Sequence, residues 1–263
     1  MKILAFAIAA ALLTQQDKVT LKFNPKKGDK LVRTEKSEMQ IKAKIVAGEQ
    51  TQDIEIEQKG SEKAVIEYQE VADGRVTKLH IDQQEDVEEK KEPGSMEWTK
   101  EEKPMHGRKV TVELKDGKIV RTGTDGLEEK DVKKLVLDDP TIYLLTKEPV
   151  AVGDTWKVEG ENVKKFLRDD DLTEGTITMK LLEIKEIDKR RCAVLSAVLD
   201  VKGKTDNDVE VAAKLDCEVV IWIERGYALS VKGKGKVSMS ASNEQFKMEG
   251  EGPITLDISV KVE

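Results

Sequence analysis

The two cysteines, Cys192 and Cys217, are the residues of this 263-residue chain whose spacing most directly suggests chemistry. They lie at equal distances from the centre of a polar turn, residues 202–208, between two segments with the alternating pattern of β-strands. Directly opposite positions in an antiparallel pair bring two Cα atoms into the range of a disulfide. The sequence therefore predicts a Cys192–Cys217 disulfide, with two reduced, buried thiols as the alternative.

The two histidines offer little for catalysis or metal binding. His80 faces Glu67 across a predicted hairpin, and His106 has no cysteine or second histidine nearby. Zinc sites need ligands at short spacings, and many serine hydrolases carry a Gly-x-Ser-x-Gly turn; the sequence contains neither pattern. We expect both histidines to be hydrogen-bonding residues, and we expect no catalytic, metal-binding or cofactor-binding residues and no cofactor.

Three further charged clusters fit no site motif. Asp169–Asp171 and Asp206–Asp208 lack the alternating ligands, the glycine and the distant glutamate of an EF-hand loop. Lys232–Lys236 alternates lysine with glycine, as in a phosphate-binding loop, but a strand pattern follows where a helix is required. We therefore assign the acidic runs to turns and these lysines to the solvent face of a strand.

The overall composition excludes whole classes of function. Lysine and arginine number 45 against 52 aspartates and glutamates, which gives a net charge of -7. A chain this acidic is not expected to bind nucleic acid. Aromatic residues make up 4% of the chain, which disfavours a sugar-stacking groove, and hydrophobic residues make up 38%, which is enough for a folded core.

Residues 1–14 differ from the rest of the chain. Lys2 gives a short basic start, and Ile3–Leu13 is an unbroken apolar run. A bilayer-spanning helix needs about 20 apolar residues, so the run predicts a secretory signal peptide and no transmembrane span. We expect export to the periplasm or the extracellular space, with cleavage near Thr14 or after Ala11. A buried N-terminal helix is the alternative.

Alternation of apolar and polar residues dominates the mature chain. The runs 227–242 and 246–262 alternate over their full length and predict a long antiparallel hairpin. A turn near Asn243-Glu244 places Met239 opposite Met248. Strands of this length favour a strongly curved sheet.

Tighter hairpins are predicted at two Asp-Gly pairs, since these residues suit the positive φ angles of a two-residue turn. Asp73-Gly74 places Val71 opposite Val76, and a second hairpin turns at Asp116-Gly117. Further alternation is found in segments 31–45, 54–58, 175–187 and 191–201. We expect about ten or more strands, mostly antiparallel because their connections are short.

Helical periodicity is confined to two short segments. Apolar residues three and four positions apart predict helices within 127–137 and 163–167. Both lie between the two groups of strands, where they can cover an open end of a curved sheet and leave a pocket. The charged segment 82–103 contains Pro93-Gly94, which suits a type II turn, and we expect an exposed hairpin there rather than a disordered linker.

Together these patterns predict an all-β or α+β fold dominated by long antiparallel strands, with a curved sheet or half-open β-barrel and one or two short helices. Gly28-Asp29 and Gly153-Asp154 each precede a strand, which suggests a degenerate duplication. We divide the mature chain into an N-terminal β group, residues 15–126, and a C-terminal β group, residues 127–263. The two groups form two lobes or one continuous domain.

The signal segment, the Gly-Asp openings, the segment Pro149–Trp156 and the β-hairpin tail resemble a family of exported bacterial proteins of uncharacterised function. The likeness covers most of the mature chain. It implies export and β architecture and no particular activity. More distantly, a curved sheet with short covering helices is similar to the half-open barrels of periplasmic lipoprotein carriers, which is a likeness of fold alone.

Three functions fit the sequence. The first is an exported, non-enzymatic protein that holds an apolar or lipid-like small molecule in its curved sheet. The second is a structural or interaction protein of the cell envelope, which would contact an envelope protein through a strand edge or the hairpin near Pro93. The third is a hydrolase whose site is dispersed along the chain. We favour the first, and empty volume inside the sheet would distinguish it from a packed core.

Overall fold

One antiparallel sheet makes up most of the molecule. The computed structural model describes residues 18–169, 171–205, 208–242 and 245–263, so the predicted signal segment, residues 1–14, lies outside the described residues. The strands are β1 (Lys30–Ala47), β2 (Gln50–Ala72), β3 (Arg75–Lys91), β4 (Trp98–Glu102), β5 (Lys109–Lys115), β6 (Lys118–Thr122), β7 (Thr155–Glu159), β8 (Leu172–Ile187), β9 (Arg190–Lys204), β10 (Glu210–Trp222), β11 (Tyr227–Ser242) and β12 (Lys247–Val262).

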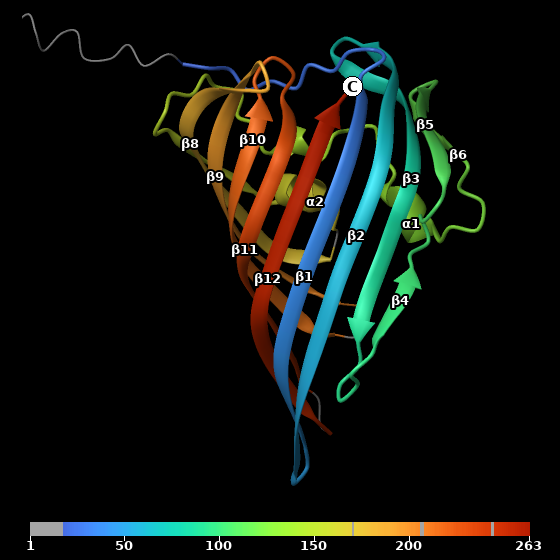
Figure 1. Ribbon diagram of the computed structural model, residues 1–263, viewed down its shortest axis with the longest axis vertical. Coiled ribbons are helices and arrows are strands. Elements are labelled where there is room, and N and C mark those ends of the chain that lie inside the picture. Colours follow the sequence, from blue (N-terminus) through green and yellow to red (C-terminus); the bar gives the residue numbers. More distant parts are fainter. Residues whose placement is uncertain (1–17, 170, 206–207, 243–244) are drawn as a thin grey trace, which may run out of the picture.

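The strands follow a meander with one long-range pair. Across the sheet the order is β6-β5-β3-β2-β1-β12-β11-β10-β9-β8-β7, and β4 pairs with the lower part of β3. The sheet ends at β6 and β7, so it curves without closing and confirms the predicted fold class (Figure 1). The pairing of β1 with β12 joins the N-terminal and C-terminal strand groups in one sheet.

Three short helices lie on the concave side of the sheet (Figure 1). They are α1 (Glu129–Lys134), the 3-10 helix η1 (Pro140–Tyr143) and α2 (Glu161–Leu167). α1 and α2 confirm the two predicted helices, whereas η1 is too short to leave a periodic signal in the sequence. In the described part of the chain, no helix is long and apolar enough to cross a membrane.

The concave face of β8–β10 carries the largest core cluster. Leu21 before β1, Leu144 after η1 and Val163 of α2 pack against the inward residues of these strands. The inward side of Gly175 on β8 lies against the Val163 side chain, so α2 approaches the sheet closely there. This half of the sheet therefore meets a packed layer of side chains rather than empty volume.

Aromatic rings close the upper end of the sheet. Phe23, Tyr68 and Tyr227 contact one another edge to face, with ring centroids 5.6 to 6.4 Å apart. The Tyr227 hydroxyl donates a hydrogen bond to the Asp29 carboxylate at 2.5 Å. Burial, reinforced by this hydrogen bond, raises the pKa of Tyr227. The few aromatic residues are thus concentrated where they bury most surface.

The two Gly-Asp motifs form the same turn in the two strand groups. The Gly28 amide donates to the Tyr68 carbonyl and the Tyr68 amide to the Asp29 carbonyl, at 2.8 and 2.9 Å. The equivalent bonds join Gly153-Asp154 to Leu181, at 2.8 and 3.0 Å. A shift in strand register follows both Tyr68 and Leu181. The duplication suggested by the sequence is therefore a repeated turn docked on a β-bulge.

Two inward-facing glycines allow the sheet to bend sharply. A side chain at Gly235 on β11 would overlap the carbonyl of Lys214 on β10. A side chain at Gly252 on β12 would overlap the carbonyl of Gln40 on β1. Because the neighbouring backbones come this close, only glycine fits at either position.

The short hairpins form as predicted. Asp73 and Gly74 have φ angles of 51° and 73°, and Val71 pairs with Val76. Asp116 and Gly117 likewise have φ angles of 51° and 75° at the β5–β6 turn. The exposed hairpin at Pro93-Gly94 is also confirmed, because β3 and β4 pair on either side of it.

The long β11–β12 hairpin forms, but two residues out of the predicted register. Met239 pairs with Gly250, and Met248 pairs with Ala241. A shift of two residues keeps each side chain on its predicted face, because the side-chain period of a strand is two. The prediction placed the turn at Asn243-Glu244, residues that lie outside the described part of the chain.

The predicted disulfide is wrong in this structure. Cys192 pairs with Trp222 and Cys217 with Ala197, and both cysteines are free thiols. Cys192 packs in a small cluster on the convex face, whereas Cys217 packs with the core of the concave face. The β9–β10 turn is centred later in the chain than the prediction assumed, so the two cysteines fall on opposite faces of the sheet.

Candidate functional site

A groove lies on the open side of the sheet, between elements from its two ends. It has a volume of about 1310 Å³, which is larger than that of a typical small-molecule pocket. We call it the helix-side groove. Its lining residues are Ala72, Asp73, Arg75, Val76, Thr77, Leu114, Ile119, Glu129, Lys130, Lys133, Lys134, Val136, Leu137, Asp138, Tyr143, Lys164, Lys165, Arg168, Asp169 and Asp171.

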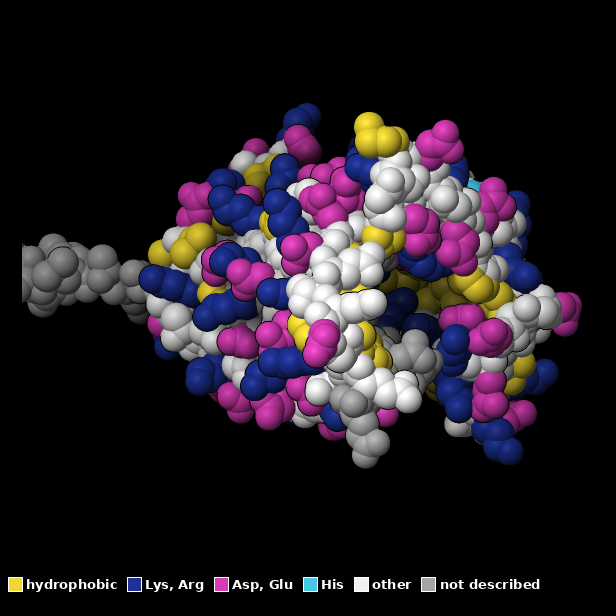
Figure 2. Space-filling view, turned by 90° about the horizontal axis from the view of Figure 1, so that it is seen from below, with side chains coloured by type: hydrophobic (Ala, Val, Ile, Leu, Met, Phe, Trp, Pro, Cys, Tyr) yellow, Lys and Arg dark blue, Asp and Glu magenta, His cyan; other side chains and the backbone are white. Residues whose placement is uncertain are grey.

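Apolar side chains form one wall of the helix-side groove and remain open to solvent. Leu114 and Ile119 pair across the β5–β6 hairpin, and 45% and 41% of their surfaces are exposed. Leu137, between α1 and η1, is buried in the same wall. α1 covers this wall without burying any of its own side chains. Seen from below, the molecule is hollowed, and hydrophobic and basic side chains show inside the recess (Figure 2).

Arg168 is the most unusual residue of the helix-side groove. It follows α2 with a left-handed backbone, φ 54° and ψ 40°, a conformation that favours glycine or asparagine at a helix end. Solvent reaches its side chain. The protein atoms around the guanidinium and the neighbouring charge of Arg33 both lower the pKa of Arg168. Among the described residues, Arg168 has no hydrogen-bond or ion-pair partner for its side chain.

A row of charged residues crosses the concave face on the strands nearest Arg168. Glu35 pairs with Glu62 on β2, which pairs with Asp86 on β3. In the opposite direction the same row is apolar, through Ile258, Val231, Val219, Leu195 and Leu181. Along this row the inner face is therefore apolar on β8–β12 and charged on β1–β3.

The electrostatics of this charged row follow from the crowding of charges and protein atoms around side chains that solvent still reaches. Burial raises the pKa of Glu62, and the charges of Glu35 and Asp86 raise it further, against the opposing effect of Arg33 and Arg168. Burial likewise raises the pKa of Asp86. The Arg33 guanidinium forms an ion pair with Glu35, with a nitrogen–oxygen distance of 2.6 Å, but its buried Nε has no hydrogen-bond partner in the described structure.

Two tyrosines border the same region and are held by aspartates. The Tyr68 hydroxyl donates to Asp139 at 3.3 Å, and burial raises the pKa of Tyr68 well above its usual range. The Tyr143 hydroxyl donates to Asp138 at 2.7 Å. Partial burial, with this hydrogen bond, raises the pKa of Tyr143 to about 12. Both tyrosines therefore stay protonated and uncharged near neutral pH.

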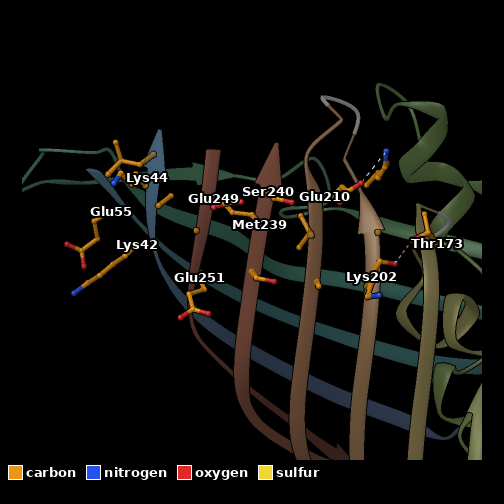
Figure 3. Close-up of a pocket in the computed structure, with 18 of the residues that line it drawn as sticks. Lys42, Lys44, Glu55, Thr173, Lys202, Glu210, Met239, Ser240, Glu249 and Glu251 are labelled. Atoms are coloured by element: carbon orange, nitrogen blue, oxygen red, sulfur yellow. Dashed lines mark hydrogen bonds and ion pairs between the residues drawn. The ribbon is translucent and has the colours of Figure 1, made fainter. Parts of the chain in front are cut away.

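A second hollow, of about 1290 Å³, lies on the concave face near the lower ends of the strands. We call it the lower hollow. Figure 3 shows Met239 on its inner face, with Lys42, Glu55 and Glu251 at one side and Thr173 and Lys202 at the other. Acidic and basic side chains alternate around it, and Lys202 pairs with Glu174 at 3.1 Å.

The inner face of the lower hollow is apolar and adaptable. Ala43, Ile54, Val211 and Met239 line it and belong to one hydrophobic cluster. The cluster also holds Met39 and Met248, and most of its members are only partly buried. Methionine side chains fill irregular spaces and adapt to different contacts. The charged rim includes the exposed ion pairs Lys202–Glu174 and Lys204–Glu210, and the apolar floor is the part that offers contacts to an apolar ligand.

The histidines and cysteines do not assemble into a site. His80 lies 3.2 Å from the Thr111 hydroxyl, and His106 accepts a hydrogen bond from the Asp86 amide at 3.2 Å and faces Glu102. Both therefore hold strands and loops together, in line with the prediction. The described residues contain no group of three or more His, Cys, Asp or Glu placed to hold a metal.

The sequence analysis missed the charged residues of the inner face. Arg33 and Glu35 have the same parity as the buried residues Leu31 and Ile41 on β1. Charged residues at the inward positions of an alternating strand therefore indicate a polar site inside the sheet. Arg168 gave no such signal, because its position depends on how α2 packs against the sheet.

The comparisons with known proteins give a fold-level likeness only. No family model matches the chain, and none of the curated proteins matches it. Among solved structures, the chain is similar to lipovitellin, in a structure that describes lipid–protein interactions, with a TM-score of 0.48 and 9% identity over 90% of this chain and 26% of that one. It also matches a DUF1329 family protein from Desulfovibrio piger, with a TM-score of 0.17 and 7% identity over 86% of this chain and 83% of that one. The chain spans about a quarter of the lipovitellin chain, and neither similarity carries an argument about function.

Proposed function

We propose that this protein binds an apolar, lipid-like small molecule in the helix-side groove. The observation that carries the proposal is the apolar wall at Leu114 and Ile119, which lies inside a concave site and stays open to solvent. Covering apolar surface is favourable by about 25 cal/mol per Å². A ligand that covers this wall therefore gains free energy that the protein alone leaves unused.

The covering helix supports the same proposal. No side chain within α1 is buried, so the helix borders the apolar wall without filling it. The helix is anchored by Leu135, which follows it and is buried in a core cluster. The lower hollow offers a second apolar surface, at Met239 and its neighbours, and serves as the comparison site in the experiment below.

We further propose that the protein is exported and that its role is binding rather than catalysis. The basic start and apolar run of residues 1–14 support export. The engagement of His80 and His106 in local hydrogen bonds supports a binding role. N-terminal sequencing of the protein isolated from cells tests export, since a chain that still begins at Met1 would contradict it.

A pair of substitutions on β6 tests the groove. Ile119 faces the helix-side groove, whereas the next residue, Val120, faces away and is equally exposed, at 41% and 40%. We expect Ile119→Lys to weaken binding of the neutral fluorophore N-phenyl-1-naphthylamine about tenfold or more, because it places a charge in an apolar wall. Val120→Lys should bind as the unmodified protein does, and fluorescence titration measures both.

The same titration assigns the ligand to one hollow. Met239→Lys places a charge in the lower hollow, and Val120→Lys, which lies outside both hollows, is again the control. If Met239→Lys weakens binding and Ile119→Lys does not, the ligand occupies the lower hollow and the proposed site is wrong. Absence of fluorophore binding, together with absence of co-purified lipid in native mass spectrometry, would sink the proposed function as a whole.

A further inference from the structure

We infer that the ligand of the helix-side groove carries an anionic head group, a carboxylate or a phosphate, which is bound by Arg168. The inference rests on the proposed function, since it names the polar end of the proposed lipid-like ligand. It adds a specificity-determining residue to a groove that otherwise offers only apolar surface.

The guanidinium of Arg168 has the chemistry that this head group needs. Arginine is charged at all physiological pH values, and its planar donors match the paired oxygens of carboxylate and phosphate. The Arg168 backbone N–H donates to the Lys164 carbonyl, but its side chain, which lines the groove and is exposed to solvent, has no hydrogen-bond or ion-pair acceptor among the described residues. A guanidinium that lines the groove and is not engaged by an acidic side chain is available to bind the oxygens of an anionic ligand.

Arg33 supplies a second positive charge beside the first. It lies close enough for the two arginines to repel each other electrostatically. Its ion pair with Glu35 uses one terminal nitrogen, while its buried Nε lacks a partner among the described residues. An anion placed near both guanidinium groups relieves their repulsion, which a neutral head group does not.

The backbone of Arg168 separates a binding role from a structural one. Its φ angle of 54° is left-handed, and glycine adopts this conformation without the strain that an arginine bears. If the side chain served only the fold, glycine would be the better residue at this helix end. A glycine substitution therefore removes the guanidinium while relieving backbone strain.

The acidic residues near Arg168 restrict which ligand charges can bind there. Asp139 is already engaged, because it accepts hydrogen bonds from the Tyr68 hydroxyl and the Thr141 amide. Glu62 is not engaged in the described part of the chain, and its charge acts on Arg168. A negative ligand bound to Arg168 is repelled by ionised Glu62, whereas a ligand with an additional ammonium group would be attracted to it.

The test compares three ligands of equal chain length: oleate, oleyl phosphate and oleyl alcohol. Each displaces N-phenyl-1-naphthylamine from the full-length protein and from Arg168→Gln, Arg168→Gly and Glu62→Gln. We expect the unmodified protein to prefer one or both anions over the alcohol about tenfold or more, as for a charge-assisted hydrogen bond. Both Arg168 variants should lose this preference and keep their affinity for the alcohol, and Glu62→Gln should bind the anions more tightly.

The outcomes separate this inference from the proposed function. Equal affinity for all three ligands, unchanged in Arg168→Gln, would overturn the anionic head group and leave apolar binding standing. Weaker anion binding in Glu62→Gln would overturn it too, because the carboxylate would then take part in binding. Failure of the fluorophore and all three ligands to bind would overturn the proposed function itself. A melting temperature of Arg168→Gly at or above that of the unmodified protein confirms that lost binding is not lost folding, and the tighter-bound anion identifies the head group.

Discussion

Glu62 and Asp86 show how single residues retain charge inside a curved sheet. Both occupy inward positions, and for both the main cause of the raised pKa is burial. For an acid, a raised pKa means that ionisation costs more free energy in the folded state than in the unfolded chain. At neutral pH these residues therefore oppose folding, which is a cost that residues in a merely structural role would not retain.

The cost at Glu62 gives a prediction about the pH dependence of stability. The folded protein holds the Glu62 proton more tightly than the unfolded chain, so this group's favourable contribution is present below the ordinary glutamate pKa, about 4.3, and is lost as the pH rises through the folded value. We expect Glu62→Gln to raise the melting temperature at pH 7, with the gain shrinking as the pH falls through the raised folded pKa and absent below about 4.3.

Differential scanning calorimetry across this range measures the effect, and Glu67→Gln is the control. Glu67 is likewise exposed and lies on the same strand, but on the opposite face and away from Glu35 and Asp86, and we expect its substitution to change stability little at any pH. Equal effects of the two substitutions would contradict the desolvation of Glu62.

At the scale of the strand, cross-strand charge pairs mask the convex face. Lys36 on β1 lies opposite Asp257, which lies opposite Lys232, which in turn lies opposite Glu218. Opposite charges in register contribute modestly to sheet stability, and like charges would oppose it. The lysine-glycine run of β11 is part of this ladder, so its lysines lie on the convex face and its glycines face the concave side.

The close approach of strands at Gly252 predicts a large effect of a single methyl group. Gly252→Ala places a Cβ against the carbonyl of Gln40, so the strands must move apart, and we expect a loss of about 1–3 kcal/mol in the free energy of unfolding. Gly60→Ala is the matched control, because its Cβ meets only the movable hydroxyl of Ser37. Urea unfolding of both variants measures the difference, and equal losses would contradict a special role for Gly252.

How much of each element the sequence could predict depends on what sets its register. The Asp73-Gly74 hairpin was predicted to the residue, because a two-residue turn with positive φ angles leaves no freedom. The β9–β10 turn was misplaced, because longer polar turns do not fix their centre and Cys192 and Cys217 biased the choice. A register error of an even number of residues leaves each side chain on its predicted face of the sheet, as for Met239.

The site was less predictable than the fold for the same reason. Arg33 and Glu62 could have been recognised from the parity of alternating strands. Arg33 shares the parity of Leu31 on β1, and Glu62 shares the parity of Ala64 and Tyr68 on β2. Arg168 could not, because its place in the groove follows from the packing of α2, which brings residues far apart in sequence together. Local sequence patterns predict which face of a strand a side chain lies on. They do not predict which side chains from distant segments come together, because that depends on tertiary packing.

At the scale of the whole molecule, neither strand group completes its core alone. The cluster around Leu31 and Tyr68 of the N-terminal group includes Tyr227 from the C-terminal group, with Trp222 and Val260 packed against it. The pairing of β1 with β12 adds a full strand ladder between the groups. The two predicted groups therefore share one sheet and a core cluster, and we expect them to unfold as one cooperative unit.

This dependence predicts the behaviour of fragments. A fragment of residues 18–126 should remain unfolded by circular dichroism and show a narrow amide region in its proton NMR spectrum, because it lacks β12 and half of its core. Mixing it with a fragment of residues 127–263 should restore strand signal. A dispersed spectrum from residues 18–126 alone would show that the N-terminal group folds independently.

The position of β1 beside β12 also determines the order of events in folding. Among the described strands, every other neighbouring pair is close in sequence and can form as a local hairpin, whereas this pair closes a loop that contains nearly the whole intervening chain. Because β1 is synthesised first, one of its edges stays unpaired until β12 has been made. During that interval the chain exposes an unpaired strand edge, a surface that can pair with another chain and aggregate unless a chaperone binds it.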